Sequence, residues 1–365
     1  MCIIVNSVGN LPLVSIIIPN YNRAKLIGQT LTSIISQSYS NWEAIVVDDG
    51  SNDGSALVVE EWSLSDSRIK LYKRTNYPKG APSCRNLGLK HALGKYIIFL
   101  DSDDLLAPWC LESRVNYMHQ NPDIDFAVFQ VLLFKQVPGD LNLLWNKFNE
   151  VQDLFRFLRT DVPWQTTSPI WEAKSLLKVG EWDTAALSWQ DWEFHIRALL
   201  LNLNYTKVAN LPDAFIRRDG EARISSGNFT PERTIALKML FEKIDDYIIT
   251  FTNDNFLRKV LSSNFLVYAE NIIVYKISID YIDFIKPLNQ RKIVSSFDFN
   301  IIIFYLKVLH FFNSKGLRKF SGAWYKFSRL YLPKYAIKDA STFSNTSISE
   351  SEMNKLQKCL SKYNG

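Results

Sequence analysis

The segment Tyr96-Ile97-Ile98-Phe99-Leu100-Asp101-Ser102-Asp103-Asp104 joins an apolar run to three carboxylates within four residues. The run predicts a strand buried on both faces, because no polar residue alternates with the apolar ones. Carboxylates at this density repel one another unless a cation or solvent relieves them. One Asp would suffice to cap a helix. Three therefore favour a site for Mg²⁺ or Mn²⁺, where the metal would hold a diphosphate.

The same arrangement of strand and polar cluster occurs twice before this segment. Val14–Ile18 is followed by Pro19-Asn20-Tyr21-Asn22, and Trp42–Val47 is followed by Asp48-Asp49-Gly50-Ser51. Apolar residues at helical spacing lie between the strands, over Leu26–Ile35, Ala56–Trp62 and Ser83–Leu93, with Gly94 as the end of the last helix. This alternation predicts an α/β fold with a mostly parallel sheet covered by helices on both faces. Ligands bind beyond the carboxyl ends of such strands, where all three clusters fall.

The composition is that of an ordinary globular protein. Of 365 residues, 47% are hydrophobic and 22% are charged, which excludes disordered, collagen-like and acidic low-complexity chains. Neither a disulfide framework nor a zinc site is expected, because the four cysteines and four histidines have no CxxC or HxxxH spacing. Reduced thiols, an amino terminus unlike a signal peptide and the lack of a long apolar run favour a cytoplasmic protein.

The chain divides into three parts by pattern. Residues 1–228 carry the strand and helix alternation, with a further strand expected over Phe126–Phe134. Thr230-Pro231-Glu232 has the capping hydroxyl, proline and acid of a helix start, and residues 229–338 are mainly helical. Residues 339–365 are rich in Ser, Asn and Thr, so we expect a loose tail there.

Three further side chains are candidates for a site, and each has a simpler explanation. Asp49 could accept a hydrogen bond from a pyrimidine base or a ribose, or could only cap a turn. Arg85 follows a loop rich in Gly and Pro and could contact a diphosphate, or could only be solvated. Asp191 lies among aromatic residues and could be a general base with a raised pKa, or could only favour the first turn of a helix.

Taken in order, these segments resemble glycosyltransferase family 2, whose members have the GT-A fold. Each motif alone is weak, but five in the same order make the resemblance specific. The motifs are Val14 to Asn22, Ser38 to Glu43 with Asp48 to Ser51, Gly80 to Gly88, Asp101 to Asp104, and Ser168 to Ile170 with Gly180 to Asp183 and Gln190 to Glu193.

The resemblance implies a Rossmann-like GT-A domain with a helical carboxy-terminal extension. It implies inverting transfer from a nucleotide-diphospho-sugar, with UDP as the expected nucleotide. Asp103 would coordinate Mn²⁺ or Mg²⁺, and Asp191 would remove the proton from the acceptor hydroxyl. Binding of the nucleotide-sugar would involve Pro19, Tyr21, Asn22, Asp49, Arg85, Asp101 and Asp104, with Asp101 near the ribose and Asp104 near the sugar.

This chain departs from the family pattern at two places. Many relatives have Glu-Asp where this chain has Gln190-Asp191. The loop Ile216–Ser225 offers arginines where relatives often have His or Arg before a Ser. Arg217 or Arg218 would then clamp the diphosphate when this loop closes.

The carboxy-terminal region has no Asp or Glu from Phe299 to Lys338, but eight Lys or Arg residues among many aromatic ones. This composition suits an anionic membrane surface, and thus a lipid-linked acceptor at the inner face of a cell membrane. A helical core with a basic solvent face explains the pattern nearly as well. No recognised nucleic-acid-binding motif is present, so no such partner is expected.

The sequence therefore predicts a metal-dependent glycosyltransferase that builds a polysaccharide or similar glycan. A nucleotidyltransferase on a related sheet is one alternative, although it would normally begin with a glycine-rich loop after the first strand. A non-catalytic scaffold that binds sugar nucleotides is the other. The acids at Asp101, Asp103 and Asp191 argue against it, because a degenerate site would lose them.

Overall fold

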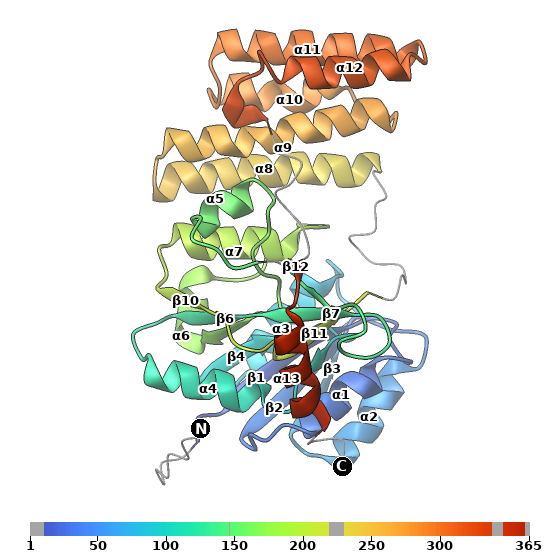
Figure 1. Ribbon diagram of the computed structural model, residues 1–365. Helices are drawn as coiled ribbons and strands as arrows, with labels where there is room; N and C mark the ends of the chain where they lie inside the picture. Colours follow the sequence, from blue (N-terminus) through green and yellow to red (C-terminus); the bar gives the residue numbers. More distant parts are fainter. Residues whose placement is uncertain (1–10, 146, 219–229, 338–345, 362–365) are drawn as a thin grey trace.

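The computed structural model describes residues 11–145, 147–218, 230–337 and 346–361. An α/β region with two sheets forms one end of the molecule, and a stack of helices forms the other end (Figure 1). The site lies between these two ends, as described below.

The larger sheet has seven strands in the order β10-β6-β9-β4-β1-β2-β3. Its central strands are parallel, and β9 runs antiparallel to both of its neighbours. The strands are β1 (Val14–Asn20), β2 (Trp42–Asp48), β3 (Ile69–Lys73), β4 (Tyr96–Phe99), β6 (Phe126–Phe129), β9 (Pro169–Glu172) and β10 (Tyr205–Val208). The prediction of a mostly parallel sheet is confirmed.

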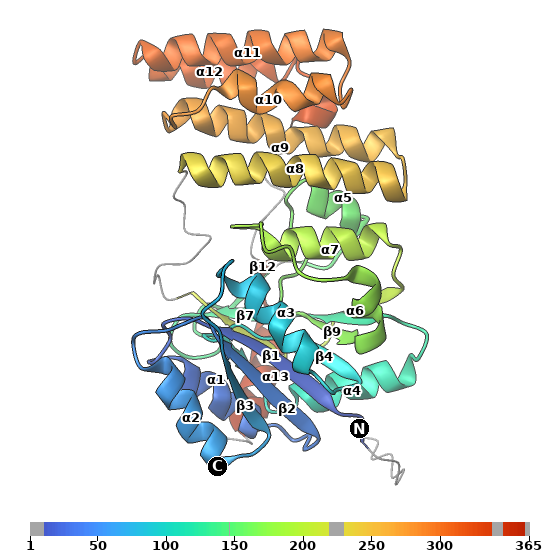
Figure 2. The ribbon, with the colours of Figure 1, turned by 180° about the vertical axis from the view of Figure 1, so that it is seen from behind.

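Helices cover both faces of this sheet (Figure 2). Ile16 and Ile18 of β1 pack on one face with residues of α1, α2 and α4, whereas Ile17 packs on the other face with residues of α6 and α7. Every residue of β1 is buried, which explains the apolar run without alternation. The helices are α1 (Ile27–Ile35), α2 (Ser55–Ser65), α3 (Ala81–His91), α4 (Cys110–Gln120), α5 (Asp153–Leu158), α6 (Ala173–Val179) and α7 (Gln190–Leu200).

Gly94 has a different role from the one expected. Helix α3 ends at His91, and Ala92 is its C-cap, so Gly94 does not close the helix. A Cβ atom at Gly94 would lie 2.6 Å from the backbone nitrogen of Ser15. The glycine therefore allows the chain to pass close to β1 before β4 begins.

The strand expected over Phe126–Phe134 is two strands in two sheets. The strand β6 ends at Phe129, and β7 (Val131–Phe134) belongs to a second sheet with the order β12-β8-β7-β11-β5. The other members are β5 (Leu105–Leu106), β8 (Leu143–Leu144), β11 (Ala214–Arg217) and β12 (Thr346–Ser347). The break falls at Gln130, the one polar residue between the two apolar runs, and a single polar residue did not reveal the change of sheet.

Of the loose tail expected over residues 339–365, the described part, residues 346–361, is instead ordered as a strand and a helix. Strand β12 pairs with β8, and α13 (Glu350–Ser361) lies against the second sheet (Figure 1). Met353 and Leu356 are buried against Phe134 and Phe215. These two apolar residues at helical spacing hold a segment whose other residues are mostly polar.

The helical end begins where the sequence predicted. Thr230 caps α8 by accepting a hydrogen bond from the backbone N–H of Arg233. Helix α8 packs on α7, and α9 packs on α5, so the stack continues directly from the α/β region. Its helices are α8 (Pro231–Phe251), α9 (Asn255–Val274), α10 (Tyr281–Gln290), α11 (Ser296–Ser314), α12 (Arg318–Ser328) and the 3₁₀ turn η1 (Lys334–Ala336).

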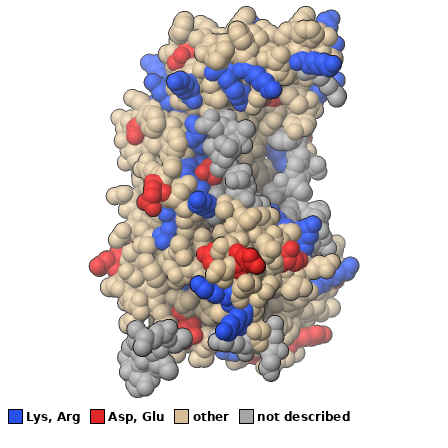
Figure 3. All heavy atoms as spheres, in the orientation of Figure 1, with Lys and Arg blue, Asp and Glu red and all other residues tan. Residues whose placement is uncertain are grey.

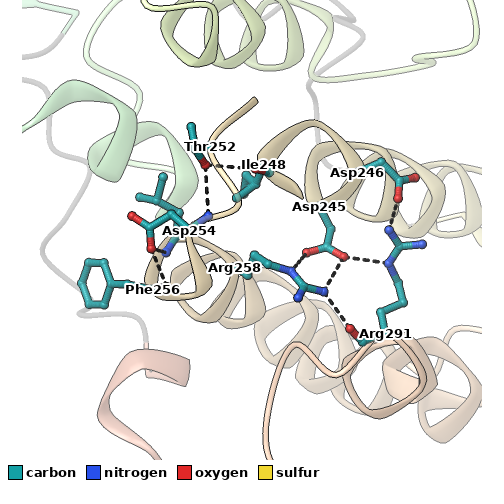
Figure 4. Close-up of polar contacts among 9 residues, drawn as sticks. Asp245, Asp246, Ile248, Thr252, Asp254, Phe256, Arg258 and Arg291 are labelled. Atoms are coloured by element: carbon teal, nitrogen blue, oxygen red, sulfur yellow. Dashed lines mark hydrogen bonds and ion pairs between the residues drawn. The ribbon is translucent and has the colours of Figure 1, made fainter. Parts of the chain in front are cut away.

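A buried ion-pair network joins α8, α9 and the end of α10 (Figure 4). The carboxylate of Asp245, which is inaccessible to solvent, accepts from Arg258 Nε at 2.6 Å and from Arg291 Nε at 2.8 Å. Asp246 on the exposed side also pairs with Arg291. These contacts fix the angle at which three helices meet.

Helices α11 and α12 form the far end of the stack (Figure 1). Ile302, Tyr305, Leu306 and Leu309 of α11 are buried, whereas large apolar side chains of both helices are exposed. The exposed ones are Phe297, Phe304 and Phe311 of α11 and Phe320, Tyr325 and Phe327 of α12, and Leu330 after α12 is exposed too. None of the helices in the described ranges is both long enough and apolar enough to cross a bilayer.

Candidate active site

A cleft of about 830 Å³ opens at the carboxyl ends of β1, β2 and β4, and α7 forms part of its wall. All eleven side chains that the sequence singled out line this cleft. They are Pro19, Tyr21, Asn22, Asp49, Arg85, Asp101, Asp103, Asp104, Asp191, Arg217 and Arg218. The structure therefore brings the candidates together. Their individual roles stay predictions.

The ends of β1 and β2 are tied together by side chains. Asn20 Nδ2 donates to Asp48 Oδ1 at 2.8 Å, and Asp48 Oδ2 accepts from the backbone N–H of Ser51 at 2.9 Å. The next carboxylate, Asp49, accepts from the backbone N–H of Gly80 at 2.6 Å and pairs with Arg74. Asp49 therefore holds the loop before α3 in place and lines the cleft at the same time.

Tyr21 and Asn22 form the rim beside these strand ends. The Tyr21 side chain is 53% exposed, so one aromatic face is open to a ligand. Asn22 adopts a positive φ of 51°, and its Oδ1 accepts from the backbone N–H of Asn52 at 2.9 Å. This bond joins the loops that follow β1 and β2, and thereby fixes the position of the tyrosine.

The three carboxylates after β4 face different partners. Asp101 Oδ1 accepts from Arg85 Nη2 at 2.8 Å, and Asp103 Oδ2 lies 3.6 Å from Arg23 Nε. Asp104 is buried, and its Oδ1 accepts from the backbone N–H of Arg217 at 2.9 Å. The side chains of Asp101 and Asp103 remain 40% and 21% exposed, so these two carboxylates are the accessible ones.

The carboxylate oxygens of this segment suit a hard divalent cation whose remaining ligands come from a bound substrate. Within the described residues, no cluster of three His, Cys, Asp or Glu side chains is arranged to hold a metal on its own. Magnesium is commonly bound by one or two carboxylates together with substrate phosphates. Asp103, with Asp101 beside it, fits that kind of site and not a closed protein cage.

Arg85 is buried beneath the cleft floor with only 4% of its surface exposed. Besides Asp101, its guanidinium contacts Gln190 Oε1 at 3.3 Å and stacks over the ring of Trp182 at 4.4 Å. Trp182 is held in turn by paired hydrogen bonds with Asn86. Arg85 thus links α3, the acidic segment and the start of α7, contacts that the sequence motifs did not disclose.

Arg217, the last residue of β11, and Arg218 directly after it differ in what they contact. Arg217 donates to the backbone oxygen of Asp103 at 2.9 Å and to Gln29 Oε1 at 2.7 Å, and stacks on Phe134. It therefore supports the backbone of the acidic segment, a role that the predicted diphosphate clamp did not include. Arg218 lies over the ring of Trp145 at 4.9 Å. The rest of the predicted loop, from residue 219 to 225, lies outside the described residues.

Asp191 occupies the first turn of α7, directly after a tight backbone turn. Trp189 before the helix has φ 59° and ψ 33°, in the left-handed region. Asp191 Oδ1 accepts from the backbone N–H of Trp192 at 3.0 Å. Burial raises the pKa of Asp191, although the nearby Arg85 partly opposes this effect. A carboxylate in this environment is more basic than an exposed one, as a general base requires.

Two other titratable groups near Asp191 can be set aside as catalysts. The Cys84 thiol lines the cleft, but burial and then Asp49 raise its pKa to about 12, so it stays protonated. Burial, followed by Arg85, lowers the pKa of His195 to about 3, so its ring is neutral at physiological pH. Asp191 therefore remains the best candidate for a base.

Sequence reasoning missed a whole wall of the cleft. Trp145, Thr160, Val162, Gln165, Thr166, Ser188, Trp189 and Trp192 line it together with Arg23. Except for Trp192 in α7, these residues come from irregular segments without a recurrent motif. Only the aromatic neighbourhood of Asp191 gave a hint of this wall.

Comparisons with known proteins agree with this geometry. Residues 15–177 match the family model described as glycosyl transferase family 2. The Escherichia coli protein described as UDP-Glc:alpha-D-GlcNAc-diphosphoundecaprenol beta-1,3-glucosyltransferase WfgD is 46% identical over 109 residues, which are 30% of this chain and 42% of that protein. A putative teichuronic acid biosynthesis glycosyltransferase, TuaG of Bacillus subtilis, is 41% identical over 108 residues, or 29% of this chain and 42% of the relative. The matched segments thus span less than half the length of these relatives.

Among solved structures, the fold resembles S. aureus TarS residues 1–349 in complex with UDP-GlcNAc. The TM-score is 0.59 at 19% identity, and the alignment covers 82% of this chain and 88% of the other. At this identity the likeness supports the fold alone. It extends beyond the family match into the helical end, and confirms a GT-A domain with a helical carboxy-terminal region.

Proposed function

We propose that this chain is an inverting glycosyltransferase that uses a nucleotide-diphospho-sugar, because its residues 15–177 match the model of glycosyl transferase family 2. The acceptor is the hydroxyl of a glycan or of a lipid-linked saccharide in polysaccharide biosynthesis. The observation that carries the proposal is the single cleft in which Asp191, with its raised pKa, shares one wall with Asp101, Asp103 and Arg85.

The donor binds in the half of the cleft formed by the strand ends. The exposed ring of Tyr21 offers a stacking surface for the base, and Asp49 and Asp101 offer acceptors for polar groups of the nucleoside. UDP is the expected nucleotide, because WfgD is described as using UDP-Glc and TarS was solved with UDP-GlcNAc. A divalent cation held by Asp103 would neutralise charge on the departing diphosphate.

Asp191 acts on the acceptor. Its carboxylate takes the proton of the acceptor hydroxyl as that oxygen attacks the anomeric carbon, and the bond from that carbon to the diphosphate oxygen breaks. One base on the face opposite the leaving group is sufficient for inversion. Arg85 holds Gln190, the neighbour of Asp191, and so keeps the start of α7 against the donor half of the cleft.

The surface at the far end of the helical stack suggests where in the cell the enzyme acts. The exposed apolar side chains of α11 and α12 accompany the basic residues Lys307, Lys315, Lys319 and Lys326. Figure 3 shows more Lys and Arg than Asp and Glu on this end of the molecule. An anionic bilayer matches both properties, and a lipid-diphosphate acceptor, as in the description of WfgD, would lie at such a surface.

Vesicle flotation tests the membrane proposal. Phosphatidylglycerol vesicles should carry the protein upward at low salt, whereas phosphatidylcholine vesicles should not. The double variant Phe304→Ser with Phe311→Ser should lose flotation. The matched control is Leu177→Ser on α6, which is 84% exposed at the other end of the molecule and should float normally. Equal loss in both variants contradicts the proposal.

The first test of the function is a thermal-shift screen of nucleotide-diphospho-sugars, with and without Mn²⁺. A native-state ligand raises the melting temperature with the logarithm of its concentration over Kd. We expect a rise with one UDP-sugar, a larger rise with Mn²⁺, and release of UDP when an acceptor is added. A rise without turnover, in wild type and Asp191→Asn alike, favours a binding scaffold instead.

A further inference from the structure

The wall of the cleft that the sequence motifs missed contains two polar groups without partners. We propose that Thr160 and Gln165 form a subsite that hydrogen-bonds the hydroxyls of a neutral pyranose in the acceptor, beside Asp191. This inference rests on the proposed glycosyl transfer and adds where, and by which groups, the acceptor sugar is recognised.

Thr160 carries the first group. Its side chain lines the cleft, the residue is only 8% exposed, and its hydroxyl has no hydrogen-bond partner among the described residues. A buried hydroxyl without a partner has lost its hydrogen bonds to water and gained none in return. A ligand that supplies the missing partner recovers that loss when it binds, so the group favours a ligand that has hydroxyls of its own.

Gln165 carries the second group, and its amide orientation is fixed. Its Oε1 accepts from the backbone N–H of Thr167 at 2.9 Å, which leaves Nε2 as the atom without a partner. The residue is 5% exposed and also lines the cleft. An N–H donor and a hydroxyl that can donate or accept, both lining one cleft, can together bind hydroxyls of a sugar ring.

The backbone supports a ligand at this place. Thr160 has φ 58°, and Trp189 on the same cleft has φ 59°. Positive φ is a genuine outlier for a β-branched or a bulky residue, and such strain is concentrated at ligand sites. Trp189 lines this wall too, and aromatic surface suits the apolar C–H face of a pyranose.

The test measures glycoside binding directly, so that it does not depend on turnover. The probes are the methyl α- and β-pyranosides of glucose, galactose, mannose and N-acetylglucosamine, titrated by saturation-transfer NMR in the presence of UDP and Mg²⁺. We expect at least one probe to bind the wild type. Thr160→Val and Gln165→Glu should each weaken it about 3- to 10-fold, the scale of one hydrogen bond.

Each variant changes one group only. Valine has the same branching as threonine and so keeps the backbone strain, and glutamate keeps an oxygen for the Thr167 N–H. Thr160→Ser retains the hydroxyl and should restore binding. The matched control is Thr167→Val, because the Thr167 hydroxyl is also buried without a partner but its side chain does not line the cleft.

Two results overturn the subsite. One is no binding of any probe to the wild type, and the other is equal weakening in Thr167→Val. Calorimetry of UDP on the same samples separates the two proposals. If the wild type binds no UDP, the donor assignment fails, whereas loss of glycoside binding with intact UDP binding in the Thr160 and Gln165 variants supports the subsite.

Discussion

The α/β region and the helical stack both contain carboxylate–guanidinium pairs, but the carboxylates of the two regions differ in their exposure to solvent. In the α/β region Asp101 pairs with Arg85 and Asp103 lies near Arg23, in a cleft that leaves both carboxylates partly exposed. In the helical stack Asp245 binds two arginines while its own side chain is inaccessible to solvent (Figure 4).

This difference in solvent exposure distinguishes an ion pair of a binding site from a structural ion pair. A pair beside a cleft can exchange its partner for a ligand, because water and substrate reach it. A pair within a helical core cannot, and removing one member leaves a buried charge uncompensated. Ion-pair geometry alone would not distinguish them.

Asp191→Asn should lower kcat by about 10²- to 10⁴-fold, because a general base contributes on that order. The amide keeps the shape of the side chain and can still accept from the Trp192 N–H. Melting temperature and UDP affinity should therefore stay close to wild type. A variant with normal turnover would remove Asp191 from the mechanism and leave the cleft without its assigned base.

Asp245→Asn should destabilise the protein by about 3–5 kcal/mol, the usual cost of breaking a buried ion pair. Urea denaturation measures the free energy of unfolding. Asp246→Asn is the matched control, because Asp246 also binds Arg291 but its side chain is 61% exposed. We expect only a small change there. Equal effects at the two positions contradict the proposed difference between exposed and buried pairs.

Glu270 provides a pH test within the helical stack. It is 9% exposed and accepts from Tyr305 Oη at 2.6 Å, and burial raises its pKa to about 7. A carboxyl whose folded pKa is raised contributes full stability below its unfolded value near 4.5. That contribution is lost as pH rises through 7. Glu270→Gln should flatten the stability profile and exceed wild type at pH 8 by about 3 kcal/mol. A profile identical to wild type argues against the raised pKa.

Asp103→Asn should weaken the metal-dependent part of donor binding by about 10-fold, the scale of one perturbed metal contact. The gain in melting temperature that Mn²⁺ adds to UDP should shrink accordingly. UDP binding without metal and the free energy of unfolding should change little, because the carboxylate is partly exposed. If Mn²⁺ acts equally on the variant, Asp103 is not its ligand.

The sequence predicted the sheet and one edge of the cleft because both depend on local pattern. Apolar strands ending in Asp49 and Asp101 imply neighbouring strand ends once the sheet is parallel. The start of α8 at Thr230 was likewise a local capping signal. Such features need only a few consecutive residues to specify them.

The remaining features depend on contacts between distant segments. The change of sheet is marked in the sequence only by Gln130 between two apolar runs, and the buried stripe of α13 lies in a polar segment. Thr160 is identified by its positive φ and its unpartnered hydroxyl, and Gln165 by its unpartnered Nε2, among the described residues. These features depend on the folded cleft and not on local sequence. No sequence motif records which hydrogen bonds a fold leaves unmade.

The return of α13 to the second sheet has a consequence for the order of synthesis. Leu356 packs in one hydrophobic cluster with Phe134. The guanidinium of Arg217 stacks on the ring of Phe134 and donates a hydrogen bond to the backbone oxygen of Asp103. On the ribosome, the segment that carries the proposed metal ligand therefore lacks this backing until α13 has emerged, some 250 residues after Asp103. The acidic edge of the cleft can reach its mature form only after that point in synthesis.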